Sequence, residues 1–274
     1  MTDLKLHVDA GKCVRCGACI RDCAPRILEF GVDGFPRLVA GGEERCTRCQ
    51  HCLAICPEGA LSILGRAPEA SAPNRNVPPP EELLDLIRCR RSFRSYRKEN
   101  LDPERLKKLR EMLAFVPTGV NAHSLDFAFV DELAVMDEIR ETVLGRLRKL
   151  MALDPLPPEA AGFSRYRRLI LAGEDAIFRG APHLLAVSAA EHSPCPQIDP
   201  VIALSYFELY AQSLGVGTLW CGLAAGALRV FPDVMARFAI PEGYRLGYVM
   251  LFGPTALHYP RAVQPEPVAI RSVR

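Results

Sequence analysis

The feature that most constrains this chain is a cysteine pattern that occurs twice near its start. The run Cys13–Cys23 reads C-x2-C-x2-C-x3-C, and the run Cys46–Cys56 repeats every spacing after an offset of 33 residues. Eight of the eleven cysteines belong to these two runs. An internal repeat of this kind predicts two similar halves related by a pseudo-twofold axis.

Each run has the spacing of bacterial iron–sulfur ligation, in which three close thiolates bind one cluster and the fourth cysteine binds the other cluster. The predicted ligands are Cys13, Cys16, Cys19 and Cys56 for one [4Fe-4S] cluster, and Cys46, Cys49, Cys52 and Cys23 for the second. Paired C-x2-C sequences also suit tetrahedral zinc, which is the minor alternative. Proline directly follows Cys56 but comes one residue later after Cys23. This part of the chain resembles the two-cluster bacterial-type ferredoxins.

Composition limits the remaining possibilities. With 274 residues, 49% hydrophobic and 24% charged, the chain is long enough for one small and one ordinary domain. The net charge of +2 gives no general reason to expect nucleic acid or a membrane as a partner. The first residues lack the apolar run of a signal peptide, so we expect the protein in the cytoplasm. Thiols stay reduced there, which favours metal binding or catalysis over disulfides.

The most apolar stretch, residues 201–228, is interrupted by Glu208, Gln212 and two glycines. It therefore predicts a buried core helix that runs into a glycine turn, and not a transmembrane helix. Asp199 and Pro200 before it are expected to be the N-cap and the first helical residue.

A proline-rich segment divides the chain. Residues 67–80 contain five prolines in fourteen positions, which predicts a semi-rigid linker between a domain at 1–66 and a domain at 81–274. In the larger domain we expect helices at 80–90 and from Asp102-Pro103 to Pro117, with strands near 125–131, 183–189 and 245–253. Short β pieces are expected after each cysteine run. The fold class is thus α+β, with a central sheet flanked by helices.

A cluster of basic residues lies at the end of the first of these helices. Residues 88–98, RCRRSFRSYRK, hold six basic side chains in eleven positions. The segment suits a solvated basic face, a nucleic-acid contact, or a phosphate pocket of arginine forks and a serine hydroxyl. Composition alone favours the solvated face. Three further stretches change this weighting: PTGVNAHSLDF at 117–127, the small-residue turn GVGTLWCG at 215–222, and a late Arg261.

In this order and spacing the four stretches resemble the nitroreductase family of FMN-binding flavoproteins, over nearly all of residues 81–274. The resemblance implies that Arg90, Ser92 and Arg94 hold the FMN phosphate and ribityl chain, with Arg261 closing on the phosphate and Arg91 reaching the flavin. It places Asn121 at the polar edge of the flavin and His123 where the family usually has Gln. It also places Pro117 and Thr118 near the ring, and Leu219, Trp220, Cys221 and Gly222 along the isoalloxazine. Pro265 stands near the position where the family often has a second late arginine.

The two resemblances together predict an iron–sulfur flavoprotein oxidoreductase and an obligate homodimer. Clusters carry single electrons, whereas a flavin can deliver two. We expect electrons to enter at the clusters, pass to FMN and reduce an organic acceptor such as a nitro compound, a quinone or an activated alkene. The electron donor would be an external ferredoxin or NAD(P)H, and no residue is assigned as the catalytic acid.

Other functions are weighed beside this one. Electrons could flow from NAD(P)H through FMN to the clusters and on to a protein acceptor, or the chain could be a non-catalytic redox sensor or a basic nucleic-acid binder. Cys89, Cys195 and Cys221 are interpreted as bystander thiols, and Trp220 as a packing residue. The segment 151–178 is poorly patterned and is expected to cover the site. The chain has no Walker A, H-E-x-x-H or G-x-G-x-x-G motif.

Overall fold

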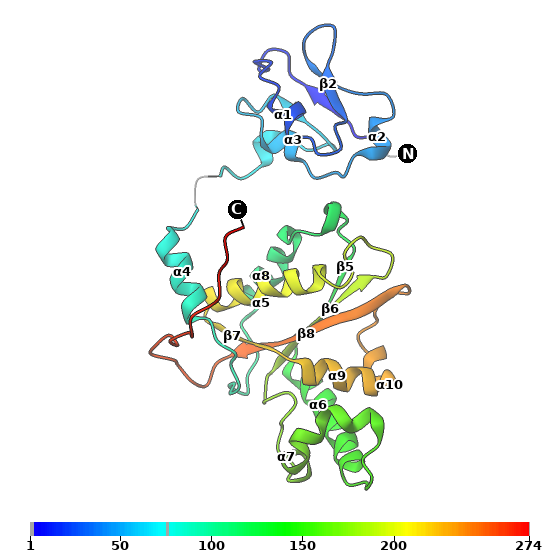
Figure 1. The fold of residues 1–274 in the computed structure, drawn as a ribbon, viewed down its shortest axis with the longest axis vertical. Helices are drawn as coiled ribbons and strands as arrows, with labels where there is room; N and C mark the ends of the chain where they lie inside the picture. The colour runs from blue at the N-terminus through cyan, green and yellow to red at the C-terminus, as the bar shows by residue number, and fades with distance from the viewer. Residues whose placement is uncertain (1–2, 75–76, 274) are drawn as a thin grey trace. The chain divides into compact units, whose positions relative to one another are not determined.

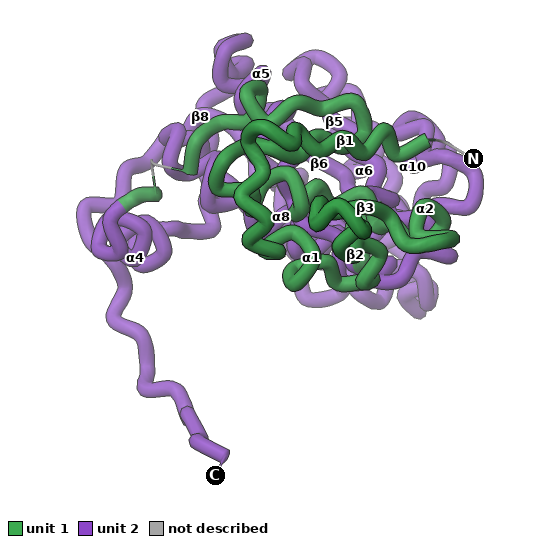
Figure 2. Tube along the Cα trace, turned by 90° about the horizontal axis from the view of Figure 1, so that it is seen from above, with its two compact units in different colours: residues 1–78, 120–122 green, residues 79–119, 123–274 purple. Residues whose placement is uncertain are grey.

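The computed structural model describes residues 3–74 and 77–273 (Figure 1). The chain forms two compact units (Figure 2). The first comprises residues 1–78 and 120–122, and the second comprises residues 79–119 and 123–274.

The first unit is small and built from short elements. They are β1 (His7–Val8), α1 (Ala18–Arg21), β2 (Leu28–Phe30), β3 (Pro36–Leu38), α2 (Gly42–Arg45), α3 (His51–Ala54), β4 (Leu61–Ser62) and η1 (Pro68–Ala70). Strands β1 and β4 pair antiparallel, and so do β2 and β3. The short β pieces expected after each cysteine run are therefore confirmed. The buried hydrophobic cluster of this unit is small, and its members are Leu4, Ile27, Leu28, Leu53, Leu61 and Ile63. A core of this size gives limited stability alone, so bound clusters would add to it.

The cysteine repeat is also a repeat of backbone conformation. Arg15 and Arg48, 33 residues apart, have left-handed φ angles of 57° and 55°. Gly17 and Gln50, again 33 apart, precede α1 and α3 with φ angles of 69° and 60°. The two halves thus turn the chain in the same way at the same points.

The loops after the fourth cysteine of each run are alike as well. The Arg26 N–H donates to the carbonyl of Cys23 (2.9 Å), and the Gly59 N–H donates to the carbonyl of Cys56 (3.2 Å). Arg26 and Gly59 both have positive φ, at 49° and 57°. The displaced proline after Cys23 therefore does not change the turn.

A four-stranded antiparallel sheet lies at the centre of the second unit (Figure 1), with strand order β5-β6-β8-β7. The strands are β5 (Leu125–Val130), β6 (His183–Ala190), β7 (Val216–Trp220) and β8 (Tyr244–Pro254). The helices are α4 (Pro80–Cys89), α5 (Pro103–Glu111), η2 (Met112–Phe115), α6 (Leu133–Met151), η4 (Pro158–Tyr166), α7 (Arg167–Leu171), α8 (Asp199–Ser213), α9 (Gly222–Val230) and α10 (Pro232–Ala236). The short helix η3 (Gly119–Asn121) begins in this unit, and its other two residues belong to the first. The expected α+β class with a central sheet is confirmed.

Alternate residues of β6 and β8 enter two different hydrophobic cores. Leu184 and Leu251 pack with α6, η4, α9 and α10, whereas Leu185 and Phe252 pack with α5 and α8. Since successive side chains of a strand point to opposite faces, helices cover both faces of the sheet.

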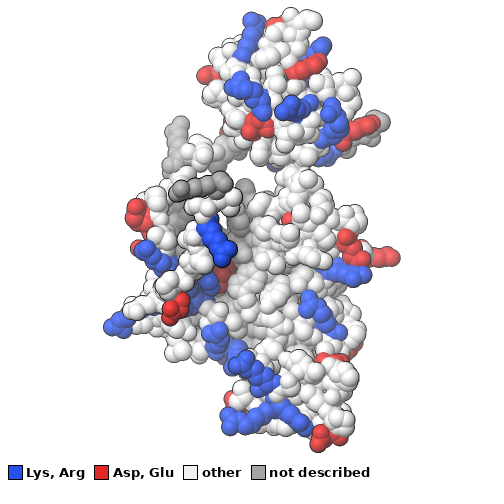
Figure 3. Space-filling view, viewed as in Figure 1, with Lys and Arg blue, Asp and Glu red and all other residues white. Residues whose placement is uncertain are grey.

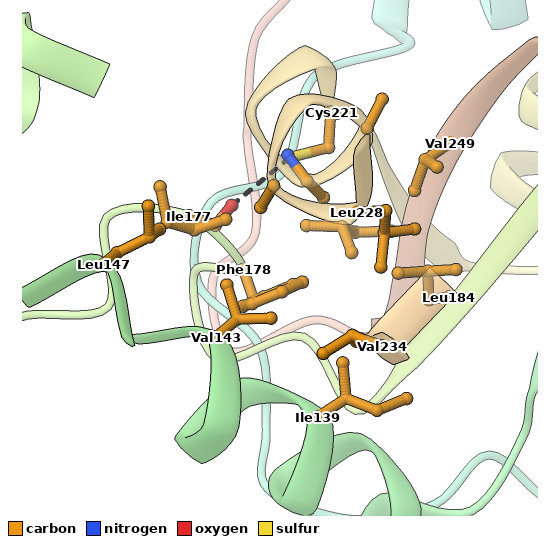
Figure 4. Close-up of a cluster of buried hydrophobic side chains, with 14 of the residues drawn as sticks. Ile139, Val143, Leu147, Ile177, Phe178, Leu184, Cys221, Leu228, Val234 and Val249 are labelled. Carbon is orange, nitrogen blue, oxygen red and sulfur yellow. Dashed lines mark hydrogen bonds between the residues drawn. The ribbon is translucent and has the colours of Figure 1, made fainter. Parts of the chain in front are cut away.

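The segment 151–178, which is expected to cover the site, contributes residues to a core of the second unit. Its residues Phe163, Ile170 and Phe178 are buried, and Figure 4 shows Phe178 beside Val143 of α6. These buried positions lie in short helical turns and are interrupted by surface residues at irregular intervals. The apolar residues therefore have no regular period, and the sequence gives no clear helix or strand prediction for this segment.

Two expectations about helix starts have different outcomes. At α5 the carboxylate of Asp102 accepts the Arg105 N–H (2.9 Å), so the predicted N-cap is confirmed. At α8 the prediction is wrong, because Ile198 is the N-cap and Asp199 lies inside the helix. The buried Asp199 carboxylate accepts the N–H of Gly119 instead, at 3.0 and 3.2 Å. The carboxylate that would accept a backbone N–H at the helix start in an N-cap accepts the Gly119 N–H from a distant segment instead.

Helix α8 is the buried core helix expected from residues 201–228, and a glycine turn at Gly215 (φ 72°) follows it. In residues 3–74 and 77–273 no helix is long and apolar enough to cross a membrane.

The prediction of a small-residue turn at 215–222 is wrong for the residues after Gly215. Residues Val216–Trp220 form β7, which pairs with β8 so that Val216 lies opposite Pro254. Gly217 is packed against protein and not against an open site, because a Cβ there would lie 2.4 Å from Cγ2 of Thr255 and 2.8 Å from Cγ of Phe93. The glycine therefore permits close packing inside the strand.

Candidate cofactor sites

The first predicted ligand set lies around one cavity. Cys13, Cys16, Cys19 and Cys56 all line it, although Cys56 is 37 residues from Cys19. Burial raises the pKa of the Cys19 thiol, and the neighbouring Cys56, Cys13 and Cys16 raise it further. The Ala60 N–H donates to Sγ of Cys56 (3.2 Å). Hydrogen bonds of this kind to sulfur are one means by which a protein tunes the potential of a cluster.

The second predicted set also groups together. Burial raises the pKa of Cys52 to about 11, and Cys49, Cys23 and Cys46 add smaller increases. Cys23 thus influences the cysteines of the other run. Among the described residues, no three His, Cys, Asp or Glu side chains are grouped tightly enough to hold a single metal ion. A [4Fe-4S] cluster takes one thiolate at each of its four irons, so its ligands surround a larger body.

The arginine segment is attached to the sheet beside β7. Ser92 forms a parallel bridge with Thr218, and the Phe93 N–H donates to the carbonyl of Thr218 (2.8 Å). In such an extended segment successive side chains point to opposite sides, so residues i, i+2 and i+4 share one side. Arg90, Ser92 and Arg94 are therefore expected on one side.

Gln212, near the end of α8, holds this segment in place. Its Oε1 accepts the Arg91 N–H (2.9 Å), and its Nε2 donates to the Arg91 carbonyl (2.8 Å) and to Oγ1 of Thr218 (2.7 Å). The side-chain amide thus satisfies both backbone groups of Arg91 and links them to β7. Sequence reasoning missed this role, although a glutamine in an otherwise apolar helix was a visible signal.

The guanidinium groups of Arg90 and Arg91 keep N–H donors that are not used by other parts of the described protein. Nη1 of Arg90 is 3.7 Å from Oε1 of Glu208, whose carboxylate is buried. Nη1 of Arg91 donates to the carbonyls of Arg88 and Arg90, whereas its Nη2 is buried without a hydrogen-bond partner among the described residues. Guanidinium groups with free donors suit a phosphate, so the residues present fit the phosphate end of FMN.

A cavity of about 250 Å³ adjoins Arg90, and residues after β8 form its other wall. Tyr259 lines this cavity, and its ring packs edge-on against the ring of Phe93 with the two centroids 5.3 Å apart. Arg261 follows two residues later and is exposed. Arg261 thus follows closely on a residue that lines the same cavity as Arg90, although no contact between Arg261 and Arg90 is found among the described residues.

The segment 117–123 has a strained backbone. Val120, Asn121 and His123 have left-handed φ angles of 46°, 58° and 47°. Such angles are unusual for residues other than glycine, and most of all for a β-branched valine. Oγ1 of Thr118 accepts the His123 N–H (2.9 Å), and Asp199 holds the preceding Gly119. Pro117 and His123 are exposed, while Asn121 is half-buried.

The residues predicted along the isoalloxazine differ in exposure. Leu219 and Cys221 are buried in the core, and Sγ of Cys221 donates to the carbonyl of Ile177 at 3.2 Å (Figure 4). Burial raises the pKa of Cys221 to about 11, which makes it an unreactive thiol. Trp220 is half-buried against Tyr248, with ring centroids 5.6 Å apart, and Gly222 is exposed.

Comparison with known proteins assigns both parts of the chain. The nitroreductase family matches residues 87–254, and the 4Fe-4S dicluster domain matches residues 12–60. A ferredoxin from Pyrobaculum islandicum is 38% identical over 69 residues, which is 25% of this chain and 62% of that protein. An uncharacterized ferredoxin from Methanocaldococcus jannaschii is 30% identical over 73 residues, which is 27% of this chain and 95% of that protein.

Solved structures resemble the second unit. A nitroreductase with bound FMN from Bacteroides fragilis has a TM-score of 0.56 at 22% identity, covering 70% of this chain and 99% of that one. A nitroreductase with bound FMN from Desulfitobacterium hafniense has a TM-score of 0.55 at 23% identity, covering 69% and 98%. At these identities the likeness shows the fold alone.

Family and fold thus agree with both resemblances noted in the sequence and with FMN and iron–sulfur clusters as the cofactor classes. The chain spans 62% of the first of its curated ferredoxin relatives and all but 5% of the M. jannaschii one. It belongs to the nitroreductase family of FMN flavoproteins and carries a 4Fe-4S dicluster ferredoxin domain ahead of that family's fold.

Proposed function

We propose that this protein is an FMN-dependent iron–sulfur oxidoreductase that takes electrons in at its clusters and gives them to an organic acceptor. The observation that carries the proposal is the combination, in one chain, of two four-cysteine sets with an arginine segment fixed on a nitroreductase sheet. When bound, clusters supply single electrons and FMN collects them in pairs for the acceptor. Nitro compounds, quinones and activated alkenes are the acceptor classes that this chemistry suits.

The cofactors would be held by the residues already located. Cys13, Cys16, Cys19 and Cys56 would bind one cluster, and Cys46, Cys49, Cys52 and Cys23 the other. Arg90, Ser92, Arg94 and Arg261 would bind the FMN phosphate and ribityl chain. The cluster thiols must stay reduced for ligation, which supports the cytoplasm as the compartment.

A homodimer is part of this proposal, because the resemblance to nitroreductases implies a flavin shared between two copies. The segment 117–123 is attached at Asp199, at the start of α8, and the arginine segment is attached at Gln212, near its end. In the dimer, an FMN held by the arginine segment of one copy would be completed by the 117–123 segment of the other. Light scattering on the purified protein should give twice the chain mass; a monomer that still binds FMN would count against this arrangement.

The main alternative reverses the direction, with NAD(P)H reducing FMN and the clusters passing electrons to a protein acceptor. The same residues serve both directions. A redox sensor would need no acceptor turnover. Nucleic-acid binding through residues 88–98 has less support, since Gln212 ties Arg91 to the sheet and acidic and basic side chains are interspersed on the face in Figure 3.

The deciding experiment uses protein purified without oxygen. Flavin and cluster absorbance are followed after mixing with NADPH, with NADH, or with a reduced ferredoxin. We expect only the ferredoxin to bleach both chromophores, and a nitroaromatic acceptor to restore them. Reduction of the flavin by a nicotinamide before the clusters change would instead establish the outward direction.

A further inference from the structure

One cluster cysteine is more exposed than the other seven. Of the eight cysteines in the two runs, Cys16 is exposed and the rest are half-buried. Its counterpart in the second run, Cys49, is among the half-buried ones. The backbone of the two runs repeats closely, so this difference comes from what surrounds each run.

Apolar side chains surround Cys16 at the surface. Val14 is 61% exposed and lines the same cavity as Cys16, and Phe30 is 48% exposed. The ring of Phe30 lies against Gly17, where an added Cβ would be 3.1 Å from Cζ. Exposed apolar groups gathered at one place are typical of an interaction site. We call Val14, Arg15, Cys16, Arg21 and Phe30 the Cys16 face.

The charged members of the Cys16 face are both arginines. Arg15 lies over the ring of Phe35, 4.4 Å from its centroid, and Nη1 of Arg21 donates to the carbonyl of Cys16 (2.7 Å). The Arg21 guanidinium is thus held at Cys16, and that of Arg15, the residue before it, is held over Phe35.

The neighbouring charges are mixed. Lys12 pairs with Glu69 (2.9 Å), and a carboxylate oxygen of Asp22 lies 3.2 Å from Nδ1 of His51, which balances its charge only when the imidazole is protonated. Glu58 is an acidic side chain that lines the cavity, and it comes from the Cys56 loop. The guanidinium that contacts the backbone of Cys16 itself, that of Arg21, is positive.

We propose that the Cys16 face is the docking surface for an acidic one-electron carrier protein. The inference rests on the proposed function, because it identifies the partner that supplies electrons to the clusters. In the transfer, the reduced carrier loses one electron and the cluster bound by Cys13, Cys16, Cys19 and Cys56 gains it, with no bond made or broken. An apolar centre with charged neighbours suits a small and short-lived interface, and the arginines would speed encounter with an acidic partner.

The repeat supplies a matched control for the test. Arg15 and Arg48 occupy equivalent left-handed positions, so Arg15→Glu and Arg48→Glu make the same chemical change at equivalent backbone sites. Full-length holoprotein of each variant is mixed without oxygen with a reduced flavodoxin of strongly negative net charge. The second-order rate constant of flavodoxin oxidation is measured from low to high ionic strength. Reduced methyl viologen, a small reductant that needs no docking, is used in parallel.

We expect Arg15→Glu to lower the flavodoxin rate roughly tenfold at low ionic strength and to flatten its salt dependence. Arg15→Gln should fall between the wild type and Arg15→Glu, and Arg48→Glu should resemble the wild type. Methyl viologen should reduce all of these proteins alike, which also verifies that their clusters are intact. Equal effects of Arg15→Glu and Arg48→Glu, an effect of Arg48→Glu alone, or no effect of either would overturn the proposal.

A further arm separates this inference from the proposed function. Protein reduced by methyl viologen is mixed with a nitroaromatic acceptor, and reoxidation of the chromophores is followed. Failure here would reject the proposed function whatever the flavodoxin result. Normal reoxidation together with an unchanged flavodoxin rate in Arg15→Glu would reject only the docking surface.

Discussion

His183 at the start of β6 is a histidine that the fold keeps neutral. It is fully buried, its Nε2 accepts the Leu101 N–H (2.9 Å), and its ring lies against Phe252. Burial lowers its pKa to about 4. An unfolded chain binds this proton near pH 6.5, so the free energy of unfolding should decrease as pH falls from 6.5 towards 4, by on the order of 3 kcal/mol.

Urea unfolding followed by the fluorescence of Trp220, the single tryptophan, measures this dependence in the second unit. His183→Phe keeps an aromatic ring but cannot titrate, so its stability should change much less between pH 7 and pH 5. Equal pH slopes for the wild type and the variant would contradict the assignment.

Gly217 inside β7 should tolerate no side chain. A Cβ would lie 2.4 Å from Thr255 and 2.8 Å from Phe93, so Gly217→Ala should lower the free energy of unfolding by about 1–3 kcal/mol. Gly145 in α6 is the matched control, because a Cβ there meets nothing within 4 Å. Gly145→Ala should be neutral or stabilising by up to about 1 kcal/mol. Thermal unfolding of both variants tests the pair, and equal losses would show that the close approach in β7 has no energetic effect.

Helix α8 positions the arginine segment through the side chain of Gln212. Removing this side chain should weaken binding of the FMN phosphate. Gln212→Leu removes all three hydrogen bonds to Arg91 and Thr218. The affinity for FMN should fall about tenfold or more, whereas the affinity for riboflavin, which lacks the phosphate, should change little. Flavin fluorescence titration of the apoprotein measures both.

Two comparisons make the Gln212 result interpretable. Arg94→Ala should lower the preference for FMN over riboflavin directly, and Ser205→Ala, a change of a half-buried residue on the same helix, should not alter it. A parallel loss of FMN and riboflavin in Gln212→Leu would point to general destabilisation of the unit instead.

Elements with strong local signals were predictable. The Asp102-Pro103 start of α5 follows from capping, and the strands β5, β6 and β8 follow from runs of apolar and aromatic residues. Strand β7 was not, because Gly215 and Gly217 are typical of a turn, and only the side chains of Phe93 and Thr255 make glycine suitable within the strand. The role of Asp199 was missed for the same reason: its partner Gly119 lies 80 residues away in the chain.

The cofactor sites divide along the same line. The cysteine sets could be read from spacing, since ligand geometry is local within each run. The roles of Gln212 and Glu208 could not be read from the sequence, because they depend on contacts between distant segments. The positions of Arg90, Ser92 and Arg94 on one extended segment fit the family motif, but what fixes that segment is visible only in the folded chain.

For the whole molecule, the two units should keep their cofactors independently. Cys56→Ser removes one ligand of the cluster bound by Cys13, Cys16 and Cys19, so about half of the iron should be lost while FMN stays bound. Iron and flavin analysis of the anaerobically purified variant measures this, with Cys89→Ser as a control cysteine outside both runs. Cluster-to-flavin electron transfer should slow. Loss of FMN together with the iron would contradict independent units.

The crossed grouping of the cysteines limits how this domain can be divided. In the proposed ligand sets, each run keeps three of the ligands of its own cluster and supplies the fourth to the other; Cys56 lines the cavity of the first set, and Cys23 lies close enough to Cys52 to raise its pKa. Doubling the motif therefore did not produce two separable modules. A peptide that ends between the runs would have an incomplete coordination sphere, and the shortest piece able to hold even one full cluster extends from Cys23 to Cys52.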